Sequence, residues 1–160
     1  MVVKAAGFVI FRRIHNTIEY LLLQASYANF HWSPPKGMTF VLEYKIKQQN
    51  FKIKFIGHID NNENEYDSAF RETLEETGLS KEDYRVYNDC TRTLSYEAQG
   101  KPKTVVYWLA ELLEIQKKIT LSNEHQAYKW LELHEATELV EYSNMKELLE
   151  YCSAYIKKIK

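Results

Sequence analysis

An acidic segment with clear start and stop signals is the feature that most constrains the fold of this chain. Asn64 is a favoured N-cap residue, and Asp67, three positions later, makes a weak capping box. Gly78 supplies a left-handed stop. These signals predict a helix from about residue 64 to Thr77. Strand-like segments precede and follow it, and this interleaving favours an α/β fold, a mixed sheet covered by helices.

The remaining elements follow from period-two and β-rich patterns and from proline positions. The predicted strands are 7–12, 18–24, 84–96, 104–113 and 127–131, and two further helices are 134–141 and 144–157. Asn144 is the expected N-cap of the last helix, with Glu147 completing a capping box. Pro34 and Pro35 exclude a helix or a central strand, so residues 26–37 are predicted to form a loop.

Composition bounds the function classes. The 160 residues suit one domain, 1–160, and 21 basic against 22 acidic residues give a net charge of −1. This balance argues against a stable nucleic-acid partner that binds through a bulk basic surface. No apolar run reaches the ~18 residues of a membrane span, and Met1–Gly7 lacks a signal peptide's pattern. Cys90 and Cys152 are expected to be reduced thiols, with a disulfide as the alternative, and this favours the cytoplasm, with the nucleus as the other compartment. We also expect a monomer.

Residues 38–57 have a pattern of their own. Phe40, Leu42, Tyr44 and Ile46 alternate with other residues, and a second alternating run follows the polar turn 48–50. Period-two patterning on both sides of a polar turn predicts an extra β-hairpin.

Three carboxylates lie on one arc of the predicted helix. At about 100° per residue, Glu72, Glu75 and Glu76 fall within roughly 100° of one another. Like charges at helix spacing repel by a few tenths of a kcal/mol per pair. Oxygen-only ligands suit a hard cation such as Mg²⁺ or Mn²⁺. From spacing alone, a solvated acidic face without any ligand is an equally good interpretation.

The residues around this helix favour the metal site. Segment 57–79 reads G-x5-E-x7-R-E-T-x-E-E-x-G-L, which resembles the box of the Nudix hydrolases. Thr73 stands where that family prefers an aliphatic residue, and Asn62 stands where many members have glycine. Asn tolerates the left-handed conformation, so the second departure is mild.

The resemblance extends over nearly the whole chain except 38–57. Four further segments, 31–37, 94–96, 101–108 and 121–130, are similar to the animal-type diadenosine tetraphosphate hydrolases of that family. The resemblance implies a Nudix α/β/α sandwich. It also implies asymmetrical hydrolysis of diadenosine tetraphosphate, a dinucleoside polyphosphate, to ATP and AMP. Water would attack phosphorus, and Mg²⁺ would be the cofactor, with Mn²⁺ as an alternative.

The same resemblance implies roles for individual residues, several of which would otherwise be taken for ordinary surface groups. The implied metal ligands are Glu72, Glu75, Glu76 and Glu124. Of these, Glu75 and Glu124 are the catalytic candidates, and Glu124 is a metal ligand or general base. The implied substrate-binding residues are Tyr27, His31, Lys36, Tyr96, Lys103 and Tyr142. The implied structural residues are Gly57, Glu63, Arg71 and Gly78, with Glu63 pairing with Arg71. His125 is expected to support the Glu124 loop.

An insertion interrupts the family pattern. In the family, Pro-Pro-Lys-Gly leads straight into the box, whereas here residues 38–57 separate Gly37 from the continuation at His58. Thirteen of these 20 residues are Phe, Tyr, Met, Ile, Asn or Lys, all with A/T-rich codons. Codons for Gly37-Met38 and for the end of the segment are compatible with splice sites. We therefore consider an in-frame retained intron, and a genuine hairpin insertion is the alternative.

Two other functions stay open at this point. One is another Nudix pyrophosphatase that acts on nucleoside triphosphates or capped RNA, which the flanking segments argue against. The other is a catalytically impaired nucleotide-binding isoform, because residues 38–57 separate Lys36 from the acidic helix.

Overall fold

A computed structural model describes residues 3–39, 63–98 and 100–159. Its strands are β1 Val3–Ile14, β2 Thr17–Ala25, β3 Trp32–Ser33, β4 Lys36–Met38, β5 Tyr84–Ala98, β6 Lys101–Leu112 and β7 His125–Leu131. Its helices are α1 Glu65–Thr77, α2 Leu133–Leu139 and α3 Ser143–Lys158, with a short 3-10 turn, η1, at Lys81–Asp83. The predicted hairpin lies outside the described residues, apart from Met38 and Thr39.

The described strands form one mixed sheet with β1 at its centre. Their order is β3-β2-β1-β6-β5, while β4 pairs with β1 and β7 pairs with β2. β1 runs parallel to β6 and antiparallel to β2 and β4. Gly7 of β1 lies opposite Lys36 of β4, and a Cβ at Gly7 would lie 2.1 Å from the carbonyl oxygen of Pro35. Glycine at position 7 therefore lets the Pro34–Gly37 segment approach the central strand.

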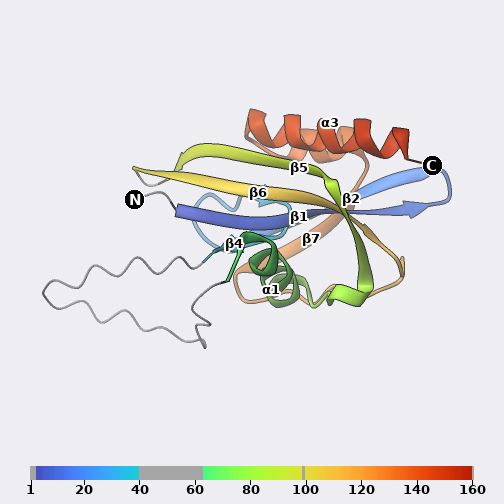
Figure 1. Cartoon of the computed structure of the whole chain (residues 1–160), viewed down its shortest axis with the longest axis horizontal. Coiled ribbons are helices and arrows are strands. Elements are labelled where there is room, and N and C mark those ends of the chain that lie inside the picture. Colours follow the sequence, from blue (N-terminus) through green and yellow to red (C-terminus); the bar gives the residue numbers. More distant parts are fainter. Residues whose placement is uncertain (1–2, 40–62, 99, 160) are drawn as a thin grey trace, which may run out of the picture.

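Helices cover both faces of the sheet, as Figure 1 shows: α3 crosses one face and α1 lies against the other. Alternate residues of β1 supply the two cores. Val9 and Phe11 belong to the cluster that includes α3 residues, whereas Phe8 and Ile10 belong to the cluster that includes Ala69 of α1. This is the α/β/α sandwich that the sequence predicts.

The predicted boundaries of α1 are confirmed within one residue. The Asn64 side chain accepts a hydrogen bond from the backbone N–H of Asp67. Gly78 has a φ of 74°, and its N–H donates to the carbonyl of Leu74. Both caps are local in sequence, which is why the pattern predicts them well.

Two local predictions were wrong. The loop expected at 26–37 contains the short strands β3 and β4, which flank Pro34 and Pro35. The prolines lack N–H donors, so the pairing stops at them rather than throughout the segment. Asn144 is not the N-cap of α3. The helix starts at Ser143, and the carbonyl of Tyr142 accepts the N–H groups of Met145 and Lys146 without any side-chain cap.

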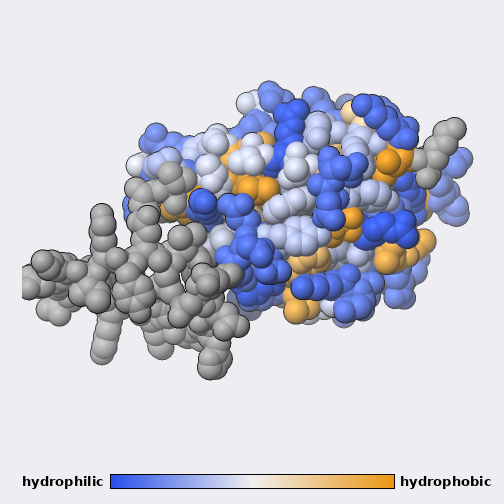
Figure 2. Space-filling model, in the orientation of Figure 1, coloured by the Kyte–Doolittle hydropathy of each residue, from blue (hydrophilic) through white to orange (hydrophobic). Residues whose placement is uncertain are grey.

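Both cysteines, Cys90 and Cys152, are buried and free. None of the described helices is long and apolar enough to cross a membrane. The described surface in Figure 2 is mostly hydrophilic, with small scattered hydrophobic areas.

Candidate active site

The carboxylates of α1 differ strongly in their surroundings. The side chain of Glu75 is 57% exposed, that of Glu72 is 12% exposed and that of Glu76 is 5% exposed. The expected common acidic arc therefore divides into one solvated group and two groups that lie against the rest of the domain. A helical wheel cannot show this, because burial at the edge of the arc depends on β4 and the loop before β7.

Glu76 is the most deeply placed carboxylate. Its Oε2 accepts the backbone N–H of Lys36 at 2.9 Å. Burial raises the pKa of Glu76 to about 8; nearby Lys36 opposes this shift, whereas the charges of Glu72 and Glu124 add to it. The negative charges of Glu72 and Glu124 thus both act on Glu76. The charged form of Glu76 is disfavoured unless a cation lies nearby.

Glu72 packs against the strand that carries the Lys-Gly pair. A Cβ at Gly37 would lie 1.9 Å from Cδ of Glu72, so only glycine leaves room for this carboxylate. Burial raises the pKa of Glu72, and the repulsion by Glu75 and Glu124 adds to the shift, while Arg71 opposes it. The close fit ties the position of β4 to that of α1.

Arg71 holds the segment before α1. Its Nε and Nη2 donate to the two carboxylate oxygens of Glu63 at 2.7 and 3.0 Å, the fork geometry that suits a guanidinium. The same side chain contacts Glu72 at 2.8 Å and Glu75 at 3.4 Å. The hydrogen bonds that Arg71 donates to Glu63 are the main reason why the pKa of Arg71 is raised. Of the predicted structural residues, Gly57 lies outside the described residues.

Three basic side chains, His31 and Lys36 of one segment and Lys103 of β6, lie within one another's electrostatic reach. Burial lowers the pKa of Lys103 on β6, and the charge of Lys36 lowers it further. Burial also lowers the pKa of His31, and both lysines add to that shift. The positive charges of these three groups repel one another, and a bound polyanion would offset that repulsion.

The three tyrosines proposed from the sequence lie close to this basic cluster. Tyr27 and Tyr142 are 52% and 56% exposed. Burial raises the pKa of Tyr96, with smaller contributions from Tyr142 and Tyr27. Nζ of Lys103 lies 6.0 Å from the centre of the Tyr96 ring. The half-buried ring of Tyr96 beside Lys103 and the two exposed rings therefore offer stacking surfaces near the basic cluster.

Glu124 sits in the loop that precedes β7. Its side chain is exposed, and its carbonyl accepts the N–H of Ser26 at 2.9 Å. The Ser26 hydroxyl also donates to the carbonyl of Asn123. These bonds join the Glu124 loop to the loop that carries Tyr27. His125 follows, with Nε2 3.8 Å from Oε1 of Glu76.

The donor chemistry of this cluster suits a hard divalent cation. Glu72, Glu76 and Glu124 repel one another, and all three offer only oxygen ligands. Among the described residues, no group of three His, Cys, Asp or Glu side chains is already positioned to hold a metal ion. Glu72 and Glu75 are turned toward Arg71 instead. The oxygen ligands therefore suit such a cation. Glu72 and Glu75 would have to rotate away from Arg71 to bind it.

One residue of this site is missing from the sequence-based set. Nδ2 of Asn29 lies 3.2 Å from Oε2 of Glu141 and 3.5 Å from the hydroxyl of Tyr142, and Oδ1 of Asn29 lies 3.2 Å from Nδ1 of His31. It therefore bridges His31 and Tyr142, two of the substrate-binding residues that the family resemblance implies. Nothing distinguishes a loop asparagine of this kind in the sequence.

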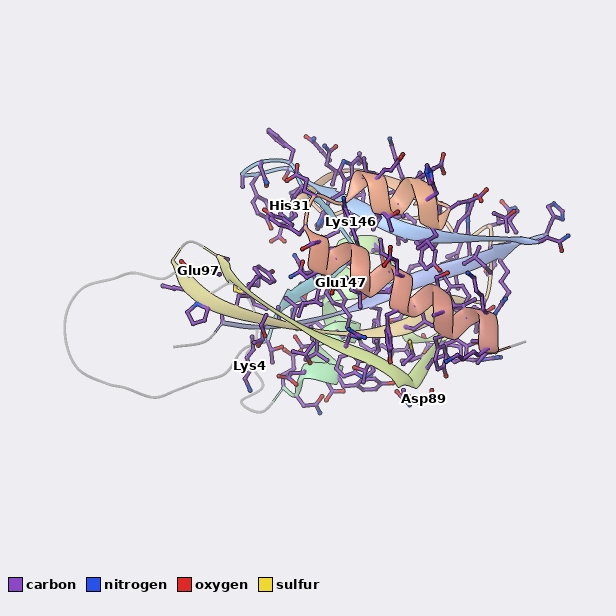
Figure 3. The ribbon with its side chains drawn as sticks, turned by 90° about the horizontal axis from the view of Figure 1, so that it is seen from above. Lys4, His31, Asp89, Glu97, Lys146 and Glu147 are labelled. Carbon is purple, nitrogen blue, oxygen red and sulfur yellow. The ribbon has the colours of Figure 1, made fainter. Side chains whose placement is uncertain are left out.

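Figure 3 shows the loop of His31 and the hairpin tip of Glu97 at the same end of the molecule as the first turns of α3.

Known proteins resemble the whole chain. A family model for the NUDIX domain matches residues 1–152. The asymmetrical bis(5'-nucleosyl)-tetraphosphatase of Caenorhabditis elegans is 45% identical, with 98% of each chain covered. The mouse enzyme of the same name is 42% identical and covers 94% of this chain, with 92% of its own length matched. A crystal structure of a C. elegans Ap4A hydrolase binary complex superposes with a TM-score of 0.81 at 43% identity, covering 98% of this chain and 99% of that one. The fold, the box and these relatives together show that the chain belongs to the NUDIX family.

Proposed function

We propose that this chain hydrolyses diadenosine tetraphosphate asymmetrically, to ATP and AMP, with Mg²⁺ as its cofactor and Mn²⁺ as an alternative. The observation that carries the proposal is the position of Lys36. Its charge acts on Glu76, on Lys103 and on His31. It therefore joins the acidic helix to the basic cluster that neighbours the tyrosines. A chain of phosphates between two adenosines matches an acidic, a basic and an aromatic region that adjoin one another.

Recognition divides between two kinds of contact. Lys36, Lys103 and His31 bind the phosphates, and the lysines do so as point charges rather than as bidentate clamps. Tyr27, Tyr96 and Tyr142 contact adenine by stacking, which contributes about 1–3 kcal/mol per base. Stacking reads a ring face rather than a pattern of donors, so a guanine dinucleotide is also cleaved to some degree.

The carboxylates have two roles, cation binding and general-base catalysis. Glu72, Glu75, Glu76 and Glu124 hold the divalent cation. When bound, the cation neutralises phosphate charge and lowers the pKa of water. Glu124 is the better general base, because its side chain is exposed and its backbone is tied to Ser26. Glu76 is a poor base, since it is buried and its Oε2 already accepts the N–H of Lys36. Glu75 is the alternative base, as it is also exposed.

Chromatography of the products tests the proposal. The full chain is incubated with diadenosine tetraphosphate and Mg²⁺, and we expect ATP and AMP in equal amounts. Two molecules of ADP would contradict asymmetrical cleavage. Faster turnover of nucleoside triphosphates or capped RNA would favour another pyrophosphatase, and tight binding without turnover would favour the impaired isoform. We also propose that 1–160 is one domain, that the protein is a monomer and that it acts in the cytoplasm or nucleus.

A further inference from the structure

The ring of His125 is buried. One of its nitrogens lies near Glu76 of α1, and the other has no partner among the described residues. Its side chain is only 7% exposed, and Nε2 lies 3.8 Å from Oε1 of Glu76. Nδ1 is buried and has no hydrogen-bond partner in the part of the chain that the structure describes. His125 begins β7, where it pairs with Ala25 just past a register shift in the β2–β7 ladder. Such shifts commonly re-aim a side chain beside a functional site.

The surroundings of the two nitrogens select one tautomer. When Glu76 is ionised, a proton on Nδ1 would leave a buried N–H without an acceptor among the described residues and would bring the Nε2 lone pair toward a carboxylate oxygen. A proton on Nε2 removes both problems, since the N–H then has Glu76 as its neighbour. Buried donors without acceptors are rare in proteins, which favours the second form.

We infer that His125 is a positioning residue for Glu76, orienting one oxygen of this carboxylate by the dipole of Nε2–H while the backbone N–H of Lys36 holds the other by a hydrogen bond. The Lys36 contact is a full hydrogen bond of 2.9 Å. At 3.8 Å the His125 contact is longer than a hydrogen bond and orients the carboxylate as a dipole.

The contacts of Glu76 come from two segments outside α1, whereas Arg71 of α1 itself contacts Glu72 and Glu75. One N–H lies near each of its oxygens, so the carboxylate plane is defined from two sides. Hydrogen-bonding partners of metal-ligating groups orient those groups, and removing such a partner typically costs about 10–100-fold in metal affinity or activity. The inference rests on the proposed function, because it requires Glu76 to take part in cation binding.

Two amide substitutions separate the roles of the two ring nitrogens. The amide nitrogen of glutamine is as many bonds from Cα as Nε2 of histidine, whereas that of asparagine matches Nδ1. We expect His125→Gln to bind Mn²⁺ within about threefold of the unsubstituted chain. His125→Asn should bind it at least about tenfold more weakly. Mn²⁺ affinity is measured on the full chain without substrate by electron paramagnetic resonance, and kcat and KM for diadenosine tetraphosphate are measured in parallel.

The outcomes separate this inference from the proposed function. Equal Mn²⁺ affinity and kcat for the Asn and Gln variants would overturn the inference, even if the unsubstituted chain cleaves diadenosine tetraphosphate well. No Mn²⁺ binding by the unsubstituted chain would overturn both proposals. Imidazole ¹⁵N spectra of the unsubstituted, metal-free chain at about pH 9, where Glu76 is ionised, give a test that needs no variant to fold. A proton on Nε2 of His125 is expected, and a proton on Nδ1 would overturn the inference.

Discussion

The backbone N–H of Lys36 donates to Oε2 of Glu76 at 2.9 Å, across 40 residues of sequence. This bond connects β4, which carries a proposed phosphate ligand, to the buried carboxylate of α1. The next residue, Gly37, packs against Glu72 of the same helix. Two consecutive residues of β4 thus contact two carboxylates of α1, and a shift of this short strand displaces the site.

Gly37→Ala tests that connection. The new Cβ would lie within 2 Å of the Glu72 side chain, so either β4 or the carboxylate must move. Misplacement by about 1 Å can cost roughly 10²-fold in rate, and we expect kcat for diadenosine tetraphosphate to fall by about that factor. Gly100→Asn is the control, since no described atom beyond its chain neighbours lies within 4 Å of a Cβ at Gly100 and asparagine tolerates its φ of 71°. Similar kcat values for the two variants would contradict the described contact.

Glu76→Gln should impair turnover far more than Glu63→Gln. Loss of a group that acts on the charge developing in the transition state typically costs about 10²–10³ in kcat. Glu63 instead holds Arg71 and the segment before α1. Steady-state kinetics at saturating Mg²⁺ measure both variants. If Glu76→Gln matched the unsubstituted chain, Glu76 would have no part in the metal site.

The stability of the metal-free protein should fall as the pH rises through the range in which Glu76 ionises. Its folded pKa of about 8 lies above the ordinary 4.5, so the folded chain binds this proton more tightly than the unfolded chain. The contribution of Glu76 is therefore complete below about pH 4.5 and is lost by about pH 8. A tenfold difference in proton affinity between the folded and unfolded chains corresponds to about 1.4 kcal/mol. Urea unfolding in a chelator should show Glu76→Gln gaining a few kcal/mol over the unsubstituted chain between about pH 5 and pH 9. A constant difference across that range would contradict the raised pKa.

Adenine stacking predicts a graded response at Tyr96. Tyr96→Phe keeps the ring and should change KM little, whereas Tyr96→Ala should raise KM about tenfold or more, since a tenfold change corresponds to about 1.4 kcal/mol. The same contrast is expected at Tyr142, whose side chain is exposed. Equal KM values for Tyr96→Ala and the unsubstituted chain would remove the stacking role.

Deleting residues 38–57 should preserve or raise turnover. The segment enters directly after Gly37, where β4 contacts α1, and its removal restores the family spacing. The carbonyl of Met38, which accepts from Arg71 and Ser68, would be replaced by that of His58. The deleted chain should also be more soluble, because an alternating apolar segment favours association. Circular dichroism and kcat measured side by side are the test, and a deleted chain that is unfolded or less active would show that the segment is integral.

Transcript sequencing addresses the origin of the same segment. A retained intron requires messages without the 60 bases that encode residues 38–57 to exist beside longer ones. If only the longer messages are found, the segment is a genuine insertion.

The sequence by itself determined the layers, the acidic helix and its ends. Asn64 and Gly78 cap α1 through bonds that span three or four residues, and the apolar, β-rich run 7–12 lies within β1. Signals of this kind are local, so a linear pattern contains them. The start of α3 was misread because the carbonyl of Tyr142, rather than the side chain of Asn144, receives the first N–H groups.

Only the tertiary structure decided which carboxylate is buried and what surrounds it. Glu75 and Glu76 are neighbours in sequence, yet one is exposed and the other lies beneath Lys36 and beside His125. The bridge from Asn29 to Glu141 and Tyr142 likewise joins residues more than 100 positions apart. The burial and pKa of a side chain depend on every segment packed around it, and those segments meet only when the sheet and its helices assemble.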